Sequence, residues 1–210
     1  NIFPHHEGEI AQSEGFTGRR IVNLWVHGQH LLADGVKMAK SSGNSFIMDD
    51  IESQGIDPLA FRYLCLTVRY KTRLNFTFNS LKSAQRGWLR LRNRIWLWGL
   101  LPPTTPVDDD VVEEWQKRFL EKVDQNLDLP GALALTWEVV HSQLPAQWRL
   151  EILREFDKIL GLGLDEVQEA YATPADVRSL AAYRSRLRQQ HKYDEADEVR
   201  NGLNNSGYVV

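Results

Sequence analysis

The stretch Lys37-Met38-Ala39-Lys40-Ser41-Ser42-Gly43-Asn44 decides how the rest of the chain is interpreted. It holds two lysines three residues apart, followed by two hydroxyl side chains, and Gly35 precedes it. Glycines on both sides of a polar run favour a mobile loop over a helix or a strand. A lysine ammonium is a compact charge that suits phosphate oxygens, so two lysines on one loop can close over a polyphosphate. A solvated surface turn explains the same residues, and the neighbouring segments have to decide between the two interpretations.

An apolar run precedes this loop. Residues 21–26 read Ile-Val-Asn-Leu-Trp-Val, a pattern that predicts a buried strand. His27 and Gly28 come at the end of this run, where open α/β sheets bind their ligands. An ordinary histidine at a strand end remains the alternative for His27.

The first residues contain a pair of metal-ligand side chains. Pro4 favours the start of a helix, which would put His5 and Glu9 one turn apart on one face. An imidazole and a carboxylate can both bind zinc, but zinc takes four donors, or three and a substrate. An exposed polar helix is therefore the simpler interpretation of the pair.

From residue 49 onward the pattern becomes helical. Asp57-Pro58 predicts an N-cap and the first turn of a helix over Leu59–Arg69. Asn79 or Ser80 is expected to cap a second helix that runs to about Trp98. One face of this helix is apolar, and the other is basic, which suits either RNA phosphates or solvent. The basic residues are Lys82, Arg86, Arg90, Arg92 and Arg94.

A proline-rich linker, residues 101–106, separates this helix from a region that we expect to be entirely helical. Its helices are predicted to begin with a capping box at Asp110, at Pro130, before Trp148, at Thr173 and near Tyr193, and the third of them is predicted to end at Gly161 and Gly163. Tryptophan and phenylalanine recur at helical spacing in this region and are expected to form its core. A second basic patch contains Arg178, Arg184, Arg186 and Arg188.

The composition limits the function classes. The chain has 210 residues, 42% of them hydrophobic, and a formal net charge of −3, so any RNA contact must come from local patches. Cys65 is its only cysteine, which excludes an internal disulfide and indicates a reducing, cytoplasmic setting. We expect Cys65 to be a small buried hydrophobe. The apolar run 95–101 is too short to cross a membrane, and the start at Asn1 suggests a fragment or a processed product.

Taken together, these segments resemble cysteinyl-tRNA synthetase, a class I aminoacyl-tRNA synthetase. Residues 3–13 are similar to the family's zinc-ligand segment, residues 25–28 to the strand end near ATP, and residues 37–41 to its signature lysine loop. The resemblance covers the whole chain but only the C-terminal part of the family. Further matching segments are 69–70, 74–76, 157–162, 196–200 and 207–208.

The resemblance implies a two-step reaction, in which ATP and Mg²⁺ activate cysteine to cysteinyl-adenylate and the cysteinyl group is then transferred to tRNA(Cys). Lys37 and Lys40 are the implied catalytic residues, and His5 and Glu9 are implied zinc ligands. Zinc prefers a thiolate to a hydroxyl, which would discriminate cysteine from serine. The implied ATP-binding residues are His27, Gly28, Lys37, Met38, Ala39, Lys40 and Ser41. The candidate tRNA-binding residues are Arg86, Arg90, Arg184 and Arg188.

Two substitutions and one absence depart from the family pattern. Ala39 replaces the usual serine of the lysine loop, and Gly8 replaces the usual asparagine of the zinc segment. The first ATP motif and two zinc-binding cysteines of the family lie upstream of these residues. We therefore expect the 210-residue chain alone to be inactive. A cysteine ligase of mycothiol synthesis and a non-catalytic helical RNA- or protein-binding module are the alternatives.

The predicted fold is mainly α. Residues 1–48 are expected to be a short α/β remnant of a Rossmann-like catalytic domain that carries the lysine loop. Residues 49–100 would form a connecting helical segment, and residues 101–210 an antiparallel helical bundle of the tRNA-binding type. We expect a monomer without a membrane segment.

Overall fold

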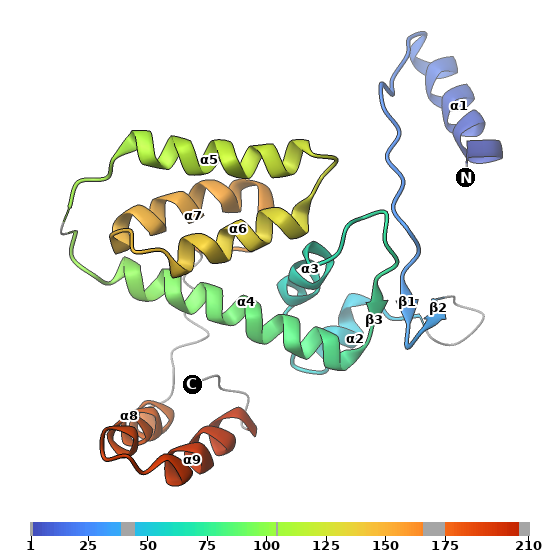
Figure 1. Ribbon diagram of the computed structural model, residues 1–210. Helices are drawn as coiled ribbons and strands as arrows, with labels where there is room; N and C mark the ends of the chain where they lie inside the picture. Colours follow the sequence, from blue (N-terminus) through green and yellow to red (C-terminus); the bar gives the residue numbers. More distant parts are fainter. Residues whose placement is uncertain (1, 39–44, 104, 166–174, 206–210) are drawn as a thin grey trace.

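The fold is mainly helical with one small sheet, as predicted (Figure 1). A computed structural model describes residues 2–38, 45–103, 105–165 and 175–205. The helical elements are η1 (Ile2–His6), α1 (Glu7–Thr17), α2 (Met48–Glu52), α3 (Pro58–Leu66), α4 (Phe78–Gly99), α5 (Asp109–Asp124), α6 (Leu129–His141), α7 (Ala146–Leu160), α8 (Ala175–Gln189) and α9 (Tyr193–Asn205). The strands are β1 (Leu32–Ala33), β2 (Val36–Lys37) and β3 (Asn75–Phe76).

The sheet has the strand order β2-β1-β3. β1 runs antiparallel to β2 and parallel to β3, and it pairs Leu32 with both Lys37 and Asn75. Asp34 and Gly35 connect β1 to β2 with φ angles of 50° and 79°. An Asp-Gly pair suits this tight hairpin because both positions need a positive φ. Lys37 therefore lies in a strand at the base of the predicted loop.

The predicted strand over residues 21–26 is wrong for the described chain. This segment is extended but pairs with no strand among the described residues, and Leu24 and Val26 are 78% and 57% exposed. The first hydrogen bond that ties it to the helical region is Gln29 N–H to the Tyr70 carbonyl, at 2.8 Å. A buried strand needs covering elements on both faces, whereas the described residues cover this segment only in part, where His6 stacks on Trp25.

The helix starts follow local capping chemistry, with small shifts from the predicted positions. Asp57 accepts a hydrogen bond from Leu59 N–H at 2.8 Å and caps α3 as predicted. Thr77 caps α4 instead of Asn79 or Ser80, because Thr77 and Ser80 form a reciprocal capping box. Likewise, α5 is capped by Asp108 and starts one residue before Asp110.

Helices α3 to α7 share one hydrophobic core with β3. Phe119 of α5 stacks on Phe156 of α7 with ring centroids 4.1 Å apart. Trp88 of α4 is fully buried, and its indole N–H donates to the Leu162 carbonyl at 2.8 Å. The predicted aromatic core is therefore confirmed, and it joins α4 to the bundle formed by α5, α6 and α7.

The end of α7 is fixed by a dense set of polar contacts. Gly161 ends the helix in the left-handed conformation, with φ 60° and ψ 44°, as the sequence predicted for this position. The Asp157 carboxylate accepts from Leu162 N–H at 2.7 Å and from Leu164 N–H at 2.8 Å. Arg62 of α3 donates from Nε to the Leu160 carbonyl. These contacts hold the turn after α7 against α3 and α4.

Helices α8 and α9 pack on each other as a hairpin, red in Figure 1. Val177 and Leu187 of α8 are buried, as are Ala196 and Leu203 of α9. The hairpin therefore has a small apolar interface of its own.

Candidate functional site

The β1–β2 hairpin places Lys37 at the start of the lysine loop. Gly35 N–H donates to Asn75 Oδ1 at 2.7 Å, so a β3 side chain fixes the turn of the hairpin. Lys37 is exposed in β2. Asn75 is therefore a positioning residue, a role that the sequence of its segment, residues 74–76, does not reveal. No local pattern could reveal this contact, because the two residues are 40 positions apart.

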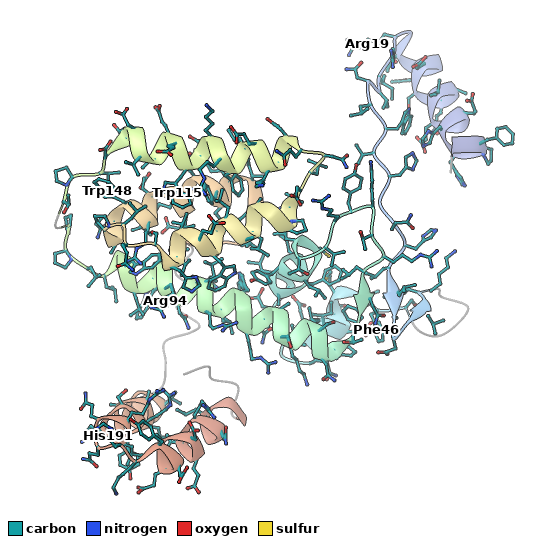
Figure 2. All side chains as sticks on the ribbon, in the orientation of Figure 1. Arg19, Phe46, Arg94, Trp115, Trp148 and His191 are labelled. Carbon is teal, nitrogen blue, oxygen red and sulfur yellow. The ribbon has the colours of Figure 1, made fainter. Side chains whose placement is uncertain are left out.

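Both flanks of the loop are anchored on the same sheet. Met38 is half-buried against the core, and its N–H donates to the Leu31 carbonyl at 3.3 Å. Beyond the loop, Phe46 packs against Phe76 and Phe78, with ring centroids 5.4 and 5.3 Å away (Figure 2). Met38 and Phe46, which flank the loop, therefore both pack against the hydrophobic core. Ala39, Lys40 and Ser41 lie outside the described residues.

His27 lies in an aromatic stack with the N-terminal helical segment. His6 stacks on Trp25 and on His27, with ring centroids 4.0 and 4.7 Å away. The pKa of His6 is lowered, mainly by desolvation and to a smaller extent by the charge of His27. Gly28 lies beside Tyr70, whose carbonyl oxygen would be 3.8 Å from an added Cβ. His27 thus contacts the N-terminal segment through His6, and Gly28 lies next to the backbone of Tyr70.

The predicted zinc ligands do not form a complete donor set. His5 lies in η1 and Glu9 in α1, and both are exposed. The described part of the chain contains no group of three or more histidine, cysteine, aspartate or glutamate residues that could hold a metal. Zinc takes four donors in structural sites and three plus a water or substrate in catalytic ones. These residues by themselves therefore do not fit a zinc ion.

The basic face of α4 is exposed but smaller than predicted. Arg86 and Arg90 are exposed, and Arg86 donates to Ser83 Oγ at 2.9 Å. Arg92, predicted on the same face, is buried over the Trp88 ring at 4.7 Å from its centroid. Arg92 follows Trp88 by one helical turn, so it lies on the core side of α4.

The second basic patch lies on α8. Arg188 is exposed, whereas Arg184 is half-buried and its Nε is buried without a hydrogen-bond partner. Because α8 packs on α9, this patch belongs to the C-terminal hairpin rather than to the α4 face.

Cys65 is exposed on α3, so the expectation of a buried residue is wrong. The core side of α3 is filled by Ala60, Tyr63 and Leu64, which leaves Cys65 outside. Partial desolvation raises the pKa of its thiol, and the nearby Arg62 opposes this shift. Among the described helices, none has both the length and the apolar character needed to cross a membrane.

Comparison with known proteins gives the same family along the whole chain. Residues 1–86 match the model of the class I tRNA synthetase (C) catalytic domain. The chain is 39% identical over 212 residues to cysteine–tRNA ligase 1 of Burkholderia lata, covering all of this chain and 44% of the relative. It is 36% identical to cysteine–tRNA ligase of Protochlamydia amoebophila, covering all of this chain and 46% of that relative. The corresponding enzyme of Leptospira interrogans is 33% identical, with all of this chain and 48% of the relative covered.

The small sheet and the lysine hairpin thus lie within the part of the chain that matches a class I tRNA synthetase catalytic domain. Along its whole length the chain is similar to cysteine–tRNA ligases, so the resemblance drawn from its motifs is confirmed. The chain spans about half the length of the curated relatives that it matches.

Proposed function

We propose that this chain is the part of a cysteine–tRNA ligase that supplies the lysine loop and the tRNA-contacting helices. The whole enzyme would use ATP, with Mg²⁺, to activate cysteine and would then charge tRNA(Cys). The observation that carries this proposal is the match of the entire chain to cysteine–tRNA ligases, together with a hairpin that presents Lys37 from an anchored loop.

In the first step, a carboxylate oxygen of cysteine attacks the α-phosphorus of ATP, and the bond to the β-phosphate breaks. Pyrophosphate leaves with the electron pair, and Lys37 and Lys40 would stabilise its negative charge. His27 and Gly28 would border the nucleotide together with Met38, Ala39 and Ser41. In the second step, a ribose hydroxyl of the tRNA attacks the carbonyl carbon of the adenylate, and AMP leaves.

His5 and Glu9 enter the proposal as two of the zinc ligands, with the other donors supplied from outside the described residues. The domain division belongs to the proposal as well. Residues 1–48 would complete the catalytic domain, residues 49–100 would connect the domains, and residues 101–210 would form the tRNA-binding bundle. We further propose a monomer that acts in the cytoplasm.

The tRNA contact is proposed for arginines of two helices, the exposed Arg86 and Arg90 on α4 and the half-buried Arg184 and exposed Arg188 on α8. Contacts to backbone phosphates position an RNA and weaken with added salt. This part of the proposal is tested by titrating a tRNA(Cys) transcript with the chain at low and high salt.

A chimera tests the catalytic part of the proposal. The matching segment of the Burkholderia lata ligase is replaced by this chain, and cysteine-dependent ATP–pyrophosphate exchange and tRNA charging are measured. The chimera is expected to be active, and Lys37→Ala to reduce its exchange rate by about 10²-fold or more. Lys117→Ala, which removes an exposed lysine of α5, is the matched control. An active chimera that is insensitive to Lys37→Ala would exclude the proposed role of the loop.

The isolated 210-residue chain is expected to show only background exchange, since one half of the ATP site and two metal ligands are not among its residues. Exchange at the rate of a complete ligase would contradict this expectation.

A further inference from the structure

Helix α4 carries positive charge without any acidic residue. None of its 22 residues is aspartate or glutamate. Arg90 and Arg94 are both exposed, and they lie one helical turn, about 6 Å, apart. Figure 2 shows Arg94 on the part of α4 that leads to the loop before α5. The cationic surface of α4 therefore continues from Arg90 toward the end of the bundle.

A third cation meets this end of α4 from another helix. Arg149 of α7 lies over the ring of Trp98, with its guanidinium carbon 4.2 Å from the ring centroid. Trp98 follows Arg94 by four residues, so the Arg149 guanidinium lies about one turn from Arg94 along α4. Arg149 is also held by a hydrogen bond from its Nη1 to the Val140 carbonyl at 3.1 Å. It is therefore a half-buried arginine in a fixed position.

Arg94 and Arg149 have no acidic partner among the described residues. None of the seven ion pairs found among the described residues includes Arg90, Arg94 or Arg149. Arg149 Nε is buried without a hydrogen-bond partner. Burial lowers the pKa of Arg149, and the positive charge of Arg94 lowers it further. The repulsion between these two positive charges costs free energy, and an anion bound between them would offset that cost.

Aromatic rings adjoin these cations. Arg90 lies over the Trp137 ring at 5.9 Å, and Trp137 stacks on His141 at 5.7 Å. Guanidinium groups held on aromatic faces keep their planar donor forks pre-organised for phosphate oxygens. The junction of α4, α6 and α7 thus carries three arginines, two of which, Arg90 and Arg149, lie over tryptophan rings.

We propose that Arg94 and Arg149 together bind one phosphate of the RNA at the junction of α4 and α7. This inference rests on the proposed tRNA contact of α4 and extends it to a second helix. Three observations carry it. The Arg149 guanidinium lies over Trp98, one helical turn along α4 from Arg94, and a hydrogen bond to the Val140 carbonyl holds it there. Neither arginine takes part in an ion pair found among the described residues.

The first experiment measures binding of a tRNA(Cys) transcript to the 210-residue chain. Arg94→Gln and Arg149→Gln are each expected to weaken binding about tenfold at low salt. Independent effects would multiply to a hundredfold loss of affinity in the double variant. Because both side chains hold one phosphate, the affinity of the double variant should fall by clearly less than that. The slope of log K against log[salt] should fall by about 0.7–0.9 for either single variant and little more for the double variant.

Arg154→Gln is the matched control, since it removes the same charge from the same helix, α7, as Arg149→Gln. Arg154 is already paired with Asp165 and Glu151, so its removal should change RNA affinity less than twofold. Equal losses in Arg94→Gln and Arg154→Gln would overturn the inference. Losses in Arg86→Gln or Arg90→Gln with none in Arg94→Gln would also overturn it, while leaving the proposed tRNA contact in place. No binding by the unsubstituted chain at low salt would overturn both.

The second experiment separates an RNA phosphate from a free anion. In buffer without phosphate, Arg94→Gln is expected to raise the melting temperature, because it removes the repulsion of Arg149, whereas Arg154→Gln lowers it. Competition by millimolar inorganic phosphate should weaken RNA binding in the unsubstituted chain and not in the double variant. Saturation by phosphate at concentrations that leave RNA binding unchanged would overturn the shared site. Arg94 is exposed, so Arg94→Gln keeps the test valid even where Arg149→Gln unfolds the chain.

Discussion

The N-terminal region, residues 2–31, and the helical region, residues 51–164, differ in how far their apolar side chains are exposed to solvent. Trp88 and Phe156 are fully buried in the helical region, whereas Phe16 and Leu24 in the N-terminal region are 93% and 78% exposed. Figure 2 shows Arg19, at the end of α1, far from the bundle. Both regions contain aromatic and aliphatic residues, so composition does not explain the difference. An apolar side chain is buried only where other elements of the fold cover it.

The small sheet joins these two regions. Its parallel β1–β3 pairing and the hydrogen bond from Gly35 N–H to Asn75 link the lysine hairpin to the helical region. The hairpin is therefore supported by the helical core, even though the segment before it is not. This arrangement explains how Lys37 holds its place while the preceding apolar segment stays exposed.

The largest predicted effect tests the contrast in burial directly. Trp88→Ala should lower the free energy of unfolding by about 3–5 kcal/mol, because it leaves a cavity in the core and an unpaired Leu162 carbonyl. Leu24→Ala should change it by less than about 0.5 kcal/mol. Urea unfolding followed by circular dichroism measures both. Similar losses for the two variants would mean that the N-terminal region contributes to the same core.

A smaller loss is expected at the turn after α7. Asp157→Ala removes the acceptor of two backbone N–H groups and should cost about 2 kcal/mol of unfolding free energy. Asp157→Asn keeps one acceptor oxygen and should lose about half as much. Equal stability of Asp157→Ala and the unsubstituted chain would show that the carboxylate does not hold this turn.

Two glycines in the same backbone conformation sharpen the comparison further. Gly161 and Gly18 both end a helix with a positive φ, at 60° and 65°. A Cβ at Gly161 would lie 2.9 Å from Arg62 Nη2, whereas a Cβ at Gly18 would meet nothing within 4 Å. Gly161→Ala should therefore cost about 1–2 kcal/mol in urea unfolding. Gly18→Ala should leave the main transition unchanged, and a shift of that transition would contradict the separation of the two regions.

The smallest effect concerns Cys65. Its thiol has a raised pKa in the folded chain, so alkylation by iodoacetamide should reach half its maximal rate at a higher pH than in the urea-unfolded chain. The neutral thiol then stabilises the fold below the unfolded pKa, and this contribution disappears as the pH rises through the folded pKa. Equal midpoints in the folded and unfolded chains would exclude the desolvation.

Helix positions could be predicted because their signals are local. The Asp57-Pro58 start and the Gly161 end involve residues within a few positions of each other, and both are confirmed. The start of α4 was missed by two residues because Thr77 and Ser80 both offer a hydroxyl, and only the backbone geometry decides which one is the cap. The family motifs likewise depend on residue identity alone, and the comparisons confirm the family.

Features that depend on distant partners could not be predicted. The run Ile21–Val26 has the composition of a buried strand, yet most of it is exposed because the described elements cover it only in part. Arg92 was expected to be exposed and is buried, whereas Cys65 was expected to be buried and is exposed. The contacts of α3 and α4 with the rest of the core decide which face of each helix is covered.

The sequence by itself determined the helices, their aromatic core and the family, since hydrogen bonds within a helix and residue spacing act over a few positions. Only the tertiary structure decided that Asn75 fixes the lysine hairpin and that Arg149 of α7 lies over Trp98 of α4. Those contacts join residues tens of positions apart, and their formation depends on how the helices and strands pack.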